Sequence, residues 1–249
     1  MSKIFYYQEI DSTNNKAKEL AAQGAPHRSL VVADRQTAGR GRRGRVWLSE
    51  ETDNVYMTIL LRPEFAPDKA PMLTLVMAYS AAQAIHSLTG LDIQIKWPND
   101  LVWAGRKLVG ILTEMSVDAG GIHYVIVGVG VNVNTEYFPK EVADTAVSLR
   151  LATGKMWDKS ELITDIEKHF EENYKLFERT EDLTGIQDAY NDLLVNRGRE
   201  VCIHGEKESY RALARGINSC GELIVCHEDG REEAVYAGEV SVRGIYGYI

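Results

Sequence analysis

Three apolar runs follow one another in the middle of the chain, with short polar segments between them. They cover residues 93–97, 108–115 and 124–133. β-Branched residues are frequent in these runs and tight turns can join them, so the pattern predicts neighbouring strands of one sheet. Residues 29–35 and 55–61 read as two earlier buried strands. The chain is therefore expected to build a sheet whose faces must be covered.

Helical spacing of apolar residues predicts the covering elements. Residues 71–88 carry apolar side chains at intervals of three and four and stop before Gly90, a residue type that commonly follows a helix. Residues 160–178 are apolar on one face and charged on the other, which indicates an amphipathic helix. Residues 186–194 are expected to form a further short helix.

A cluster of small polar residues at positions 11–14 predicts the start of another helix, which should end near Gly24. Such residues cap helices because a side-chain oxygen accepts a hydrogen bond from a free backbone N–H of the first turn. Ser12 or Thr13 is the expected cap.

The residue pattern of the sequence changes at Glu200. From there, about five short alternating segments separated by glycine turns predict a small β-barrel. We therefore expect an α+β fold, with a mixed β-sheet flanked by helices in residues 1–194 and a barrel domain in residues 195–249.

Composition excludes several classes of protein. The chain has 249 residues, 45% of them apolar, and a net charge of −8, with acidic residues in excess both before and after Val195. A domain that holds nucleic acid mainly through phosphates would be basic, so this balance argues against one.

No apolar run approaches the roughly 20 residues of a membrane span, and the N-terminus lacks the pattern of a secretory signal, so we expect a cytoplasmic protein. Three cysteines and six histidines show no spacing typical of a metal site, and no metal ligand is predicted.

The most unusual segment is residues 39–45, in which four arginines alternate with three glycines. Glycine leaves a backbone mobile, and guanidinium groups bind phosphate or carboxylate with paired hydrogen bonds. The segment matches neither phosphate-loop pattern, G-x-x-x-x-G-K-[ST] or G-x-G-x-x-G before a helix, so a different anion site is expected. A nucleic-acid tract and plain solubility remain alternative interpretations.

Two further segments stand at strand ends. Residues 96–101 and 105–112 are expected to form a hairpin that brings Asp100 close to Lys107. Exposed hairpin charges are the alternative interpretation. Residues 128–132 place two glycines near the end of a strand, where a ligand can lie against the backbone or where the glycines mark only a bulge.

Taken together, five ordered motifs resemble the biotin protein ligase, or biotin–[acetyl-CoA-carboxylase] ligase, family. The motifs are residues 11–14, 36–47, 96–101, 106–112 and 128–132. The resemblance implies a catalytic fold like that of class II aminoacyl-tRNA synthetases followed by an SH3-like barrel. Bifunctional members carry an N-terminal DNA-binding domain, and since this sequence starts at the catalytic motifs, the monofunctional type without DNA binding is expected.

The family's reaction has two steps. Biotin and MgATP form biotinyl-5′-adenylate and pyrophosphate, and a lysine of a biotin carboxyl carrier protein or domain then takes the biotinyl group. Biotin and ATP are both anions, so cations must neutralise them, and the resemblance assigns Arg40, Arg42 and Lys107 to this work, with Mg²⁺. Asp100 is the candidate to orient or deprotonate the acceptor lysine.

The family motifs also place the binding residues. For biotin they are Ser12, Thr13, Asn14, Gln36, Arg40, Gly41, Arg42, Lys107 and Gly110; for the nucleotide they are Arg42, Trp47, Asn99 and Asn132. Trp47 is expected to stack on adenine or to pack in the core. Residues 39–45 are expected to be mobile without ligand and ordered with it, because a reactive adenylate needs shielding from water.

Three alternatives remain open at this point. A lipoate–protein ligase shares the fold and the adenylate chemistry. A non-catalytic module that binds anions or nucleic acid would use the arginine segment and the barrel, and an enzyme that makes the adenylate without a carrier is also compatible with the sequence. Membrane partners are not expected, and the sequence leaves monomer and homodimer open.

Overall fold

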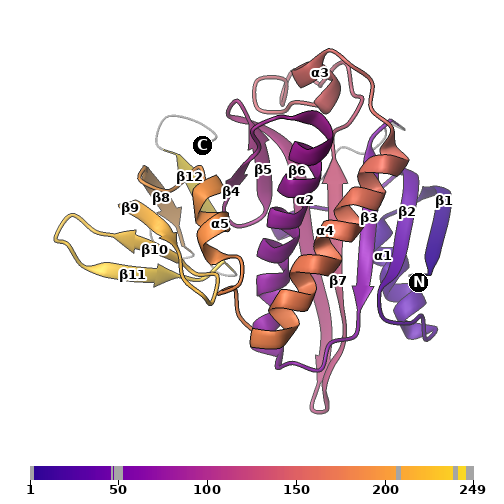
Figure 1. Cartoon of the computed structure of the whole chain (residues 1–249), viewed down its shortest axis with the longest axis horizontal. Coiled ribbons are helices and arrows are strands. Elements are labelled where there is room, and N and C mark those ends of the chain that lie inside the picture. Colours follow the sequence, from indigo (N-terminus) through magenta and orange to yellow (C-terminus); the bar gives the residue numbers. More distant parts are fainter. Residues whose placement is uncertain (1–2, 46, 48–52, 206–208, 238–240, 245–249) are drawn as a thin grey trace.

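Two β-sheets organise the protein, one of seven strands and one of five, as Figure 1 shows for the computed structural model. The structure describes residues 3–45, 47, 53–205, 209–237 and 241–244. The larger sheet contains β1 (Ile4–Ile10), β2 (Ser29–Gln36), β3 (Val55–Leu61), β4 (Gln94–Lys96), β5 (Asp100–Trp103), β6 (Arg106–Asp118) and β7 (Gly121–Val131). Their spatial order is β1-β2-β3-β7-β6-β5-β4. The sheet is mixed, because β1 and β2 are parallel and the other neighbours antiparallel.

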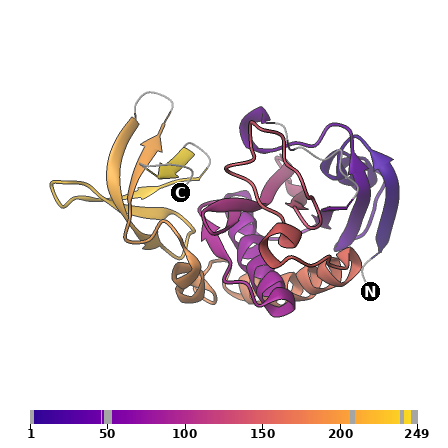
Figure 2. The ribbon, with the colours of Figure 1, turned by 90° about the horizontal axis from the view of Figure 1, so that it is seen from above.

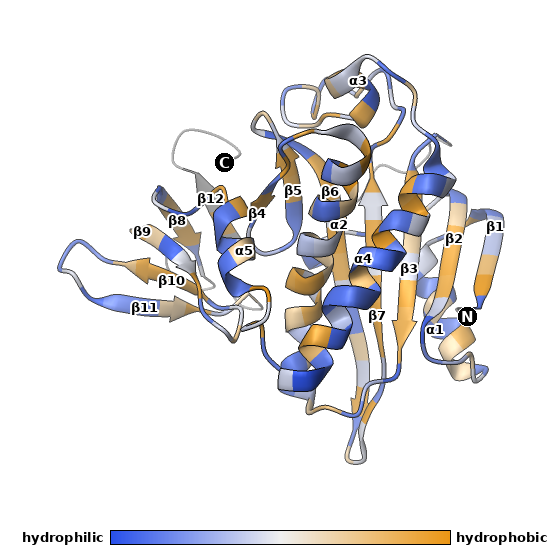
Figure 3. Ribbon diagram, in the orientation of Figure 1, coloured by the Kyte–Doolittle hydropathy of each residue, from blue (hydrophilic) through white to orange (hydrophobic). Residues whose placement is uncertain are grey.

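Helices cover both faces of this sheet. The first is α1 (Thr13–Ala22), which links the parallel strands β1 and β2 and packs on β2, β3 and β7. On the other face lie α2 (Leu73–Thr89) and α4 (Lys159–Thr180), which pack against each other (Figure 1). Every residue of β3 is buried, and all but Thr58 are apolar, as expected for a strand covered on both faces. Figure 3 shows the mainly hydrophobic strands behind an α4 whose near side is largely hydrophilic.

The remaining helical elements are short. They are the 3₁₀ turns η1 (Arg42–Gly44) and η2 (Pro67–Met72) and the helices α3 (Leu149–Thr153) and α5 (Gln187–Leu193). The predicted long helices and the short helix before the barrel are confirmed, and Gly90 ends α2 with the expected positive φ of 72°. The elements that were not predicted are β1, β5, α3 and the two 3₁₀ turns. Among the helices that the structure describes, none has the length and apolar character needed to cross a bilayer.

The start of α1 differs from the prediction in a way that builds the site. Ser12 occupies the position before the helix, but neither Ser12 nor Thr13 caps it with its side chain. The backbone N–H of Thr13 instead donates to Oε1 of Gln36 at 2.7 Å, at the end of β2. The expected local cap was wrong because a residue distant in the sequence satisfies that donor.

The smaller sheet follows α5 and lies beside the rest of the chain (Figure 2). It consists of β8 (Glu200–His204), β9 (Ser209–Ile217), β10 (Leu223–Cys226), β11 (Glu232–Val235) and β12 (Ser241–Gly244). Its order is β11-β10-β9-β8-β12 with antiparallel pairing throughout, and it confirms the small SH3-like β domain. Trp97, which is 1% exposed, joins the two parts by donating from Nε1 to the carbonyl of Gly221 at 3.0 Å. The division of the chain at residues 194 and 195 stays a prediction.

Candidate active site

A pocket of about 480 Å³ opens at the start of α1 and contains residues from both sheets. Its lining includes nearly all of the residues predicted for the site, namely Ser12, Thr13, Asn14, Gln36, Arg40, Gly41, Arg42, Trp47, Asn99, Asp100, Lys107 and Gly110. Lys96, Thr145 and, from the smaller sheet, Val242 also line it. Segments distant in the sequence, from Ser12 to Val242, thus meet at one concave site.

Glycines form the floor of the pocket. Gly110 of β6 pairs with Gly130 of β7, and the indole of Trp47 lies directly on both. A Cβ added at Gly110 or at Gly130 would lie 2.7 Å from an indole atom. The absence of side chains on these strands therefore makes room for the indole of Trp47, and the expected contact of a ligand with this backbone stays a prediction.

Trp47 is a wall of the pocket and does not belong to the hydrophobic core. The ammonium of Lys107 lies 5.1 Å from its ring centroid, and its buried Nε1 has no hydrogen-bond partner among the described residues. This indole N–H is a buried donor without a partner in the described part of the chain, which is costly in free energy. Stacking on adenine stays a prediction, and Val46, the preceding residue of the motif, lies outside the described residues.

One end of the pocket, here named the uncharged end, is lined mainly by uncharged hydrogen-bonding groups, with Arg40 beside them. Thr13 donates twice to Oε1 of Gln36, from its backbone N at 2.7 Å and from Oγ1 at 3.0 Å. The hydroxyl of Thr58 on β3 lies 2.8 Å from Oγ1 of Thr13 and 2.8 Å from Oδ1 of Asn14. Because a hydroxyl carries one proton and two lone pairs, this cluster can adapt to both donors and acceptors on a ligand.

Asn14 anchors this end of the pocket to the sheet. Its Nδ2 donates to the carbonyl of Leu112 at 3.3 Å and to Oε2 of Glu114 at 2.9 Å. Both amide hydrogens therefore point to protein groups, and only Oδ1 can serve a ligand. Gly128 makes the approach feasible, since a Cβ there would lie 2.0 Å from Oδ1 of Asn14.

The other end of the pocket is charged. The predicted hairpin places Nζ of Lys107 2.7 Å from Oδ1 of Asp100, which confirms that these residues are close. Arg42 donates to Oδ1 of Asn99 at 3.2 Å and to the carbonyl of Ala237 in the smaller domain. Burial lowers the pKa of Arg42, as do its arginine neighbours, whereas Asp100 acts in the opposite direction. An additional anion at this end would relieve the crowding of positive charge.

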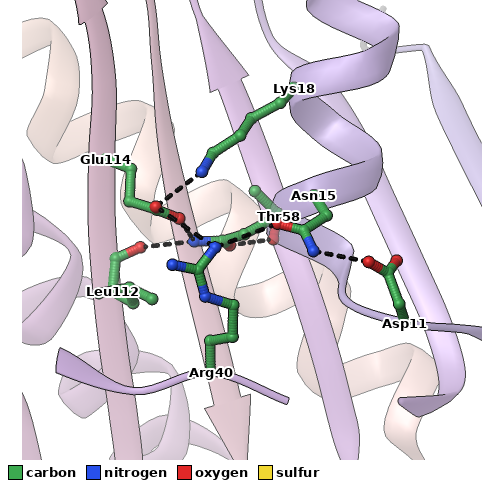
Figure 4. Close-up of polar contacts among 8 residues, drawn as sticks. Asp11, Asn15, Lys18, Arg40, Thr58, Leu112 and Glu114 are labelled. Carbon is green, nitrogen blue, oxygen red and sulfur yellow. Dashed lines mark hydrogen bonds and ion pairs between the residues drawn. The ribbon is translucent and has the colours of Figure 1, made fainter. Parts of the chain in front are cut away.

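Arg40 and Arg42 point to opposite ends of the site. Arg40 donates to Oδ1 of Asn15 at 3.2 Å, and its Nη1 lies 3.8 Å from Oε1 of Glu114 (Figure 4). From the sequence, both arginines are expected to act as one anion-binding group. Their partners separate them, with Arg40 at the start of α1 and Arg42 beside Asn99.

Asn132 is the one predicted site residue that does not line the pocket as described. It is 7% exposed, and its Nδ2 donates to the carbonyl of Val147 at 3.2 Å. The strand-like segment around Val147 runs beside Lys107, whose backbone N donates to the carbonyl of Thr145 at 2.7 Å. Asn132 thus supports the charged end from outside, and its role toward a nucleotide stays a prediction.

Several polar residues at the site were not predicted: Lys96 and Thr145 in the lining, and Thr58 and Glu114 behind it. Thr58 and Glu114 both stand within apolar strand segments, where a polar side chain needs a buried partner. That interruption of an apolar run is the signal that could have found them.

Comparison with known proteins agrees with this geometry. The sequence model of the Biotin/lipoate A/B protein ligase family matches residues 6–132. The chain belongs to this family. It is 36% identical over 241 residues to the bifunctional ligase/repressor BirA of Bacillus spizizenii, covering 96% of this chain and 74% of the relative. It is 31% identical over 239 residues to the biotin–[acetyl-CoA-carboxylase] ligase of Paracoccus denitrificans, covering 94% of this chain and 98% of the relative.

A solved structure of the same family extends the agreement to the whole fold. The biotin protein ligase of Aquifex aeolicus in complex with biotin and ATP is 32% identical, with a TM-score of 0.86 over 98% of this chain and 100% of that one. The match includes the C-terminal sheet as well as the catalytic part. The expected fold class, a mixed sheet flanked by helices with a small C-terminal β domain, is thereby confirmed.

Proposed function

We propose that this chain is an ATP-dependent biotin protein ligase, which forms biotinyl-5′-adenylate and transfers the biotinyl group to a lysine of a biotin carboxyl carrier protein or domain. The observation that carries the proposal is a single pocket with an uncharged hydrogen-bonding end and a cationic end. Biotin has this polarity, with a neutral cyclic urea at one end and a carboxylate at the other. The curated relatives named as biotin ligases and the biotin and ATP complex of the Aquifex aeolicus protein support the same choice.

The uncharged end suits the urea ring. A cyclic urea offers two N–H donors and one carbonyl acceptor, and the cluster of Ser12, Thr13 and Gln36 supplies hydroxyl and amide groups in a buried setting. Thr58 and Asn14 fix this cluster from behind. Recognition would therefore depend on groups that are already in place before the ligand binds.

The cationic end suits the reacting groups. A carboxylate attacks the α-phosphate of ATP, with loss of pyrophosphate, only when the repulsion between the two anions is offset. Lys107 stands where it can contact both, and Arg42 adds a second cation from the arginine segment. Trp47 would cover the same region and limit access of water to the adenylate.

Asp100 is the candidate for the second step. An acceptor lysine must lose a proton before it attacks the adenylate carbonyl, because an ammonium is not a nucleophile. Once Lys107 binds the anionic ligand, Asp100 is the carboxylate beside it that can orient the incoming amine or accept its proton. AMP then leaves as the amide bond forms.

Magnesium belongs to the nucleotide substrate in this proposal. The described residues contain no group of three or more histidine, cysteine or acidic side chains that could hold a metal ion. Asp100 is the one carboxylate in the described lining, and it is already paired with Lys107. Mg²⁺ bound mainly by phosphates and water fits such a site.

Lipoate is a poorer match to the uncharged end. Its dithiolane ring cannot pair with the hydroxyl and amide groups around Thr13 and Gln36, and leaving buried polar groups without partners is costly. The family name covers both substrates, so this difference is the one to test.

The decisive experiment is single-turnover transfer of labelled biotin to a purified carrier domain with MgATP, with lipoate as competitor. We expect formation of the adenylate, labelling of the carrier and no effect of equimolar lipoate. Preferential transfer of lipoate would show that lipoate, and not biotin, is the substrate. Adenylate formation without labelling of any carrier would remove the transfer step, and the absence of both reactions would overturn the proposal.

A further inference from the structure

Glu114 lies behind the uncharged end of the pocket, on β6, and takes no part in the steps described above. Its carboxylate contacts Nζ of Lys18 at 2.7 Å and accepts from Nδ2 of Asn14 at 2.9 Å. Nη1 of Arg40 lies 3.8 Å away (Figure 4). A single side chain thus contacts α1 twice and the arginine segment once.

The carboxylate of Glu114 is partly buried, and its surroundings favour the ionised form. Its side chain is 22% exposed, and burial by itself would raise its pKa. The hydrogen bonds from Lys18 and Asn14, with the charges of Lys18 and Arg40, outweigh burial and lower the pKa. An ionised carboxylate between two cations is a fixed negative point at which positively charged segments can be held.

The helix geometry makes the two α1 contacts act together. Asn14 and Lys18 are four residues apart, so both project from the same face of α1 toward β6. Arg40 also donates to Oδ1 of Asn15, the next residue of α1. Glu114 therefore lies where β6, the first turn of α1 and the arginine segment converge, immediately beside the groups proposed to read the urea ring.

We propose that Glu114 is a positioning residue for biotin recognition, which holds Asn14 and the start of α1 in place and attracts Arg40 to the uncharged end of the pocket. Arg40 then retains biotin, and Arg42 serves the phosphate end. This inference rests on the proposed function, because it assigns the uncharged end to biotin. Substitution of Glu114 should therefore change the binding of biotin and not the binding of ATP.

The test compares steady-state adenylation by the wild type, Glu114→Gln and Glu114→Ala, with KM measured separately for biotin and for ATP. Glutamine can still accept the hydrogen bond from Asn14 but carries no charge. We expect alanine to raise the KM for biotin by about tenfold, the equivalent of ~1.4 kcal/mol, and glutamine by less. The KM for ATP and kcat at saturating biotin should change by less than about twofold, since the contacts at Lys107 are untouched.

A matched control is Glu233→Gln in the smaller sheet, which also removes a carboxylate that lies 3.8 Å from an arginine nitrogen, Nη1 of Arg231. It should leave both KM values unchanged. The double variant Glu114→Gln with Arg40→Gln should weaken biotin binding by less than the sum of the single effects, because the two side chains act as one unit.

The possible outcomes distinguish a failure of the positioning role of Glu114 from a failure of the proposed function. If the wild type forms adenylate and Glu114→Ala leaves the KM for biotin within twofold, or raises both KM values equally, the positioning role is overturned and the proposed function stands. If the wild type binds no biotin and forms no adenylate, the proposed function fails, and this inference fails with it.

Discussion

The ammonium of Lys107 and the carboxylate of Asp100 lie 2.7 Å apart across the hairpin of β5 and β6, at the charged end of the pocket. Each is held by its strand and partly shielded from solvent, with side-chain exposures of 26% and 15%. The ion pair is therefore already formed in the absence of a ligand. A ligand anion can then bind Lys107 by replacing the carboxylate of Asp100 as the partner of its ammonium.

Replacing Lys107 should affect the first chemical step. We expect Lys107→Ala to slow adenylate formation by roughly 10²–10³-fold, the effect typical of removing one fixed charge-stabilising donor. Rapid-quench measurement of adenylate at saturating biotin and ATP would show it, with the exposed Lys155→Ala as control. A loss smaller than about fivefold would mean that other cations carry the charge.

The two arginines of the glycine-rich segment should differ in kinetics. Arg42 contacts Asn99 and the smaller domain, whereas Arg40 contacts Asn15. We expect Arg42→Ala to raise the KM for ATP and to slow adenylation, and Arg40→Ala to act chiefly on the KM for biotin. Arg179→Ala on α4 provides a control for loss of an exposed arginine. Equal effects of both variants on both substrates would show that the arginines work as one group.

Much of the fold follows from local patterns in the sequence. The strands predicted at residues 29–35, 55–61 and 124–133 were recognisable because apolar, often β-branched residues dominate them, and α2 because its spacing ends at a glycine with the expected φ. β1 escaped prediction because it is an edge strand whose side chains, such as Ile4 and Tyr6, are largely exposed. Its strand character comes from pairing with β2 and not from burial.

The site was predictable where its geometry is local. Asp100 and Lys107 belong to one hairpin, so their proximity follows from strand pairing alone. The separation of Arg40 from Arg42 does not, because their sequence surroundings are nearly identical and the difference lies in distant partners, Glu114 and Asn99. Likewise, only the tertiary contact with Glu114 reveals that the amide hydrogens of Asn14 are already used.

Gly128 should be intolerant of the smallest side chain. An added Cβ would lie 2.0 Å from Oδ1 of Asn14, which would push that amide off β7. We expect Gly128→Ala to cost about 1–3 kcal/mol of stability by overpacking and to weaken biotin binding. Chemical denaturation and a biotin titration measure the two effects. Gly185→Ala is the matched control, because its added Cβ would have no contact shorter than 3.5 Å. Wild-type biotin affinity in Gly128→Ala would refute the anchoring role of Asn14.

Trp97 should contribute to stability through one hydrogen bond between the two parts of the chain. Trp97→Phe keeps most of the buried ring but removes the donor to the carbonyl of Gly221. We expect a loss of about 1–3 kcal/mol, the cost of a buried group left without its partner. Urea unfolding measures this loss, with Trp103→Phe, a half-buried tryptophan of β5, as comparison. Equal losses in both variants would mean that the hydrogen bond adds nothing beyond packing.

The ionisation of Glu114 should make the free energy of unfolding depend on pH in a specific way. Its folded pKa lies below the ordinary value of 4.5, so its ionised form favours the folded state. This contribution is fully present above that ordinary value, which applies to the unfolded chain, and is lost as the pH falls through the lower folded value. The free energy of unfolding should thus differ most between the wild type and Glu114→Gln near neutral pH. The difference should shrink when urea titrations are repeated below about pH 4, as linkage requires. Glu141→Gln, at an exposed position, should show no such convergence. A difference between the wild type and Glu114→Gln that stays constant from pH 7 to acid would show that the negative charge of Glu114 does not stabilise this end of the pocket.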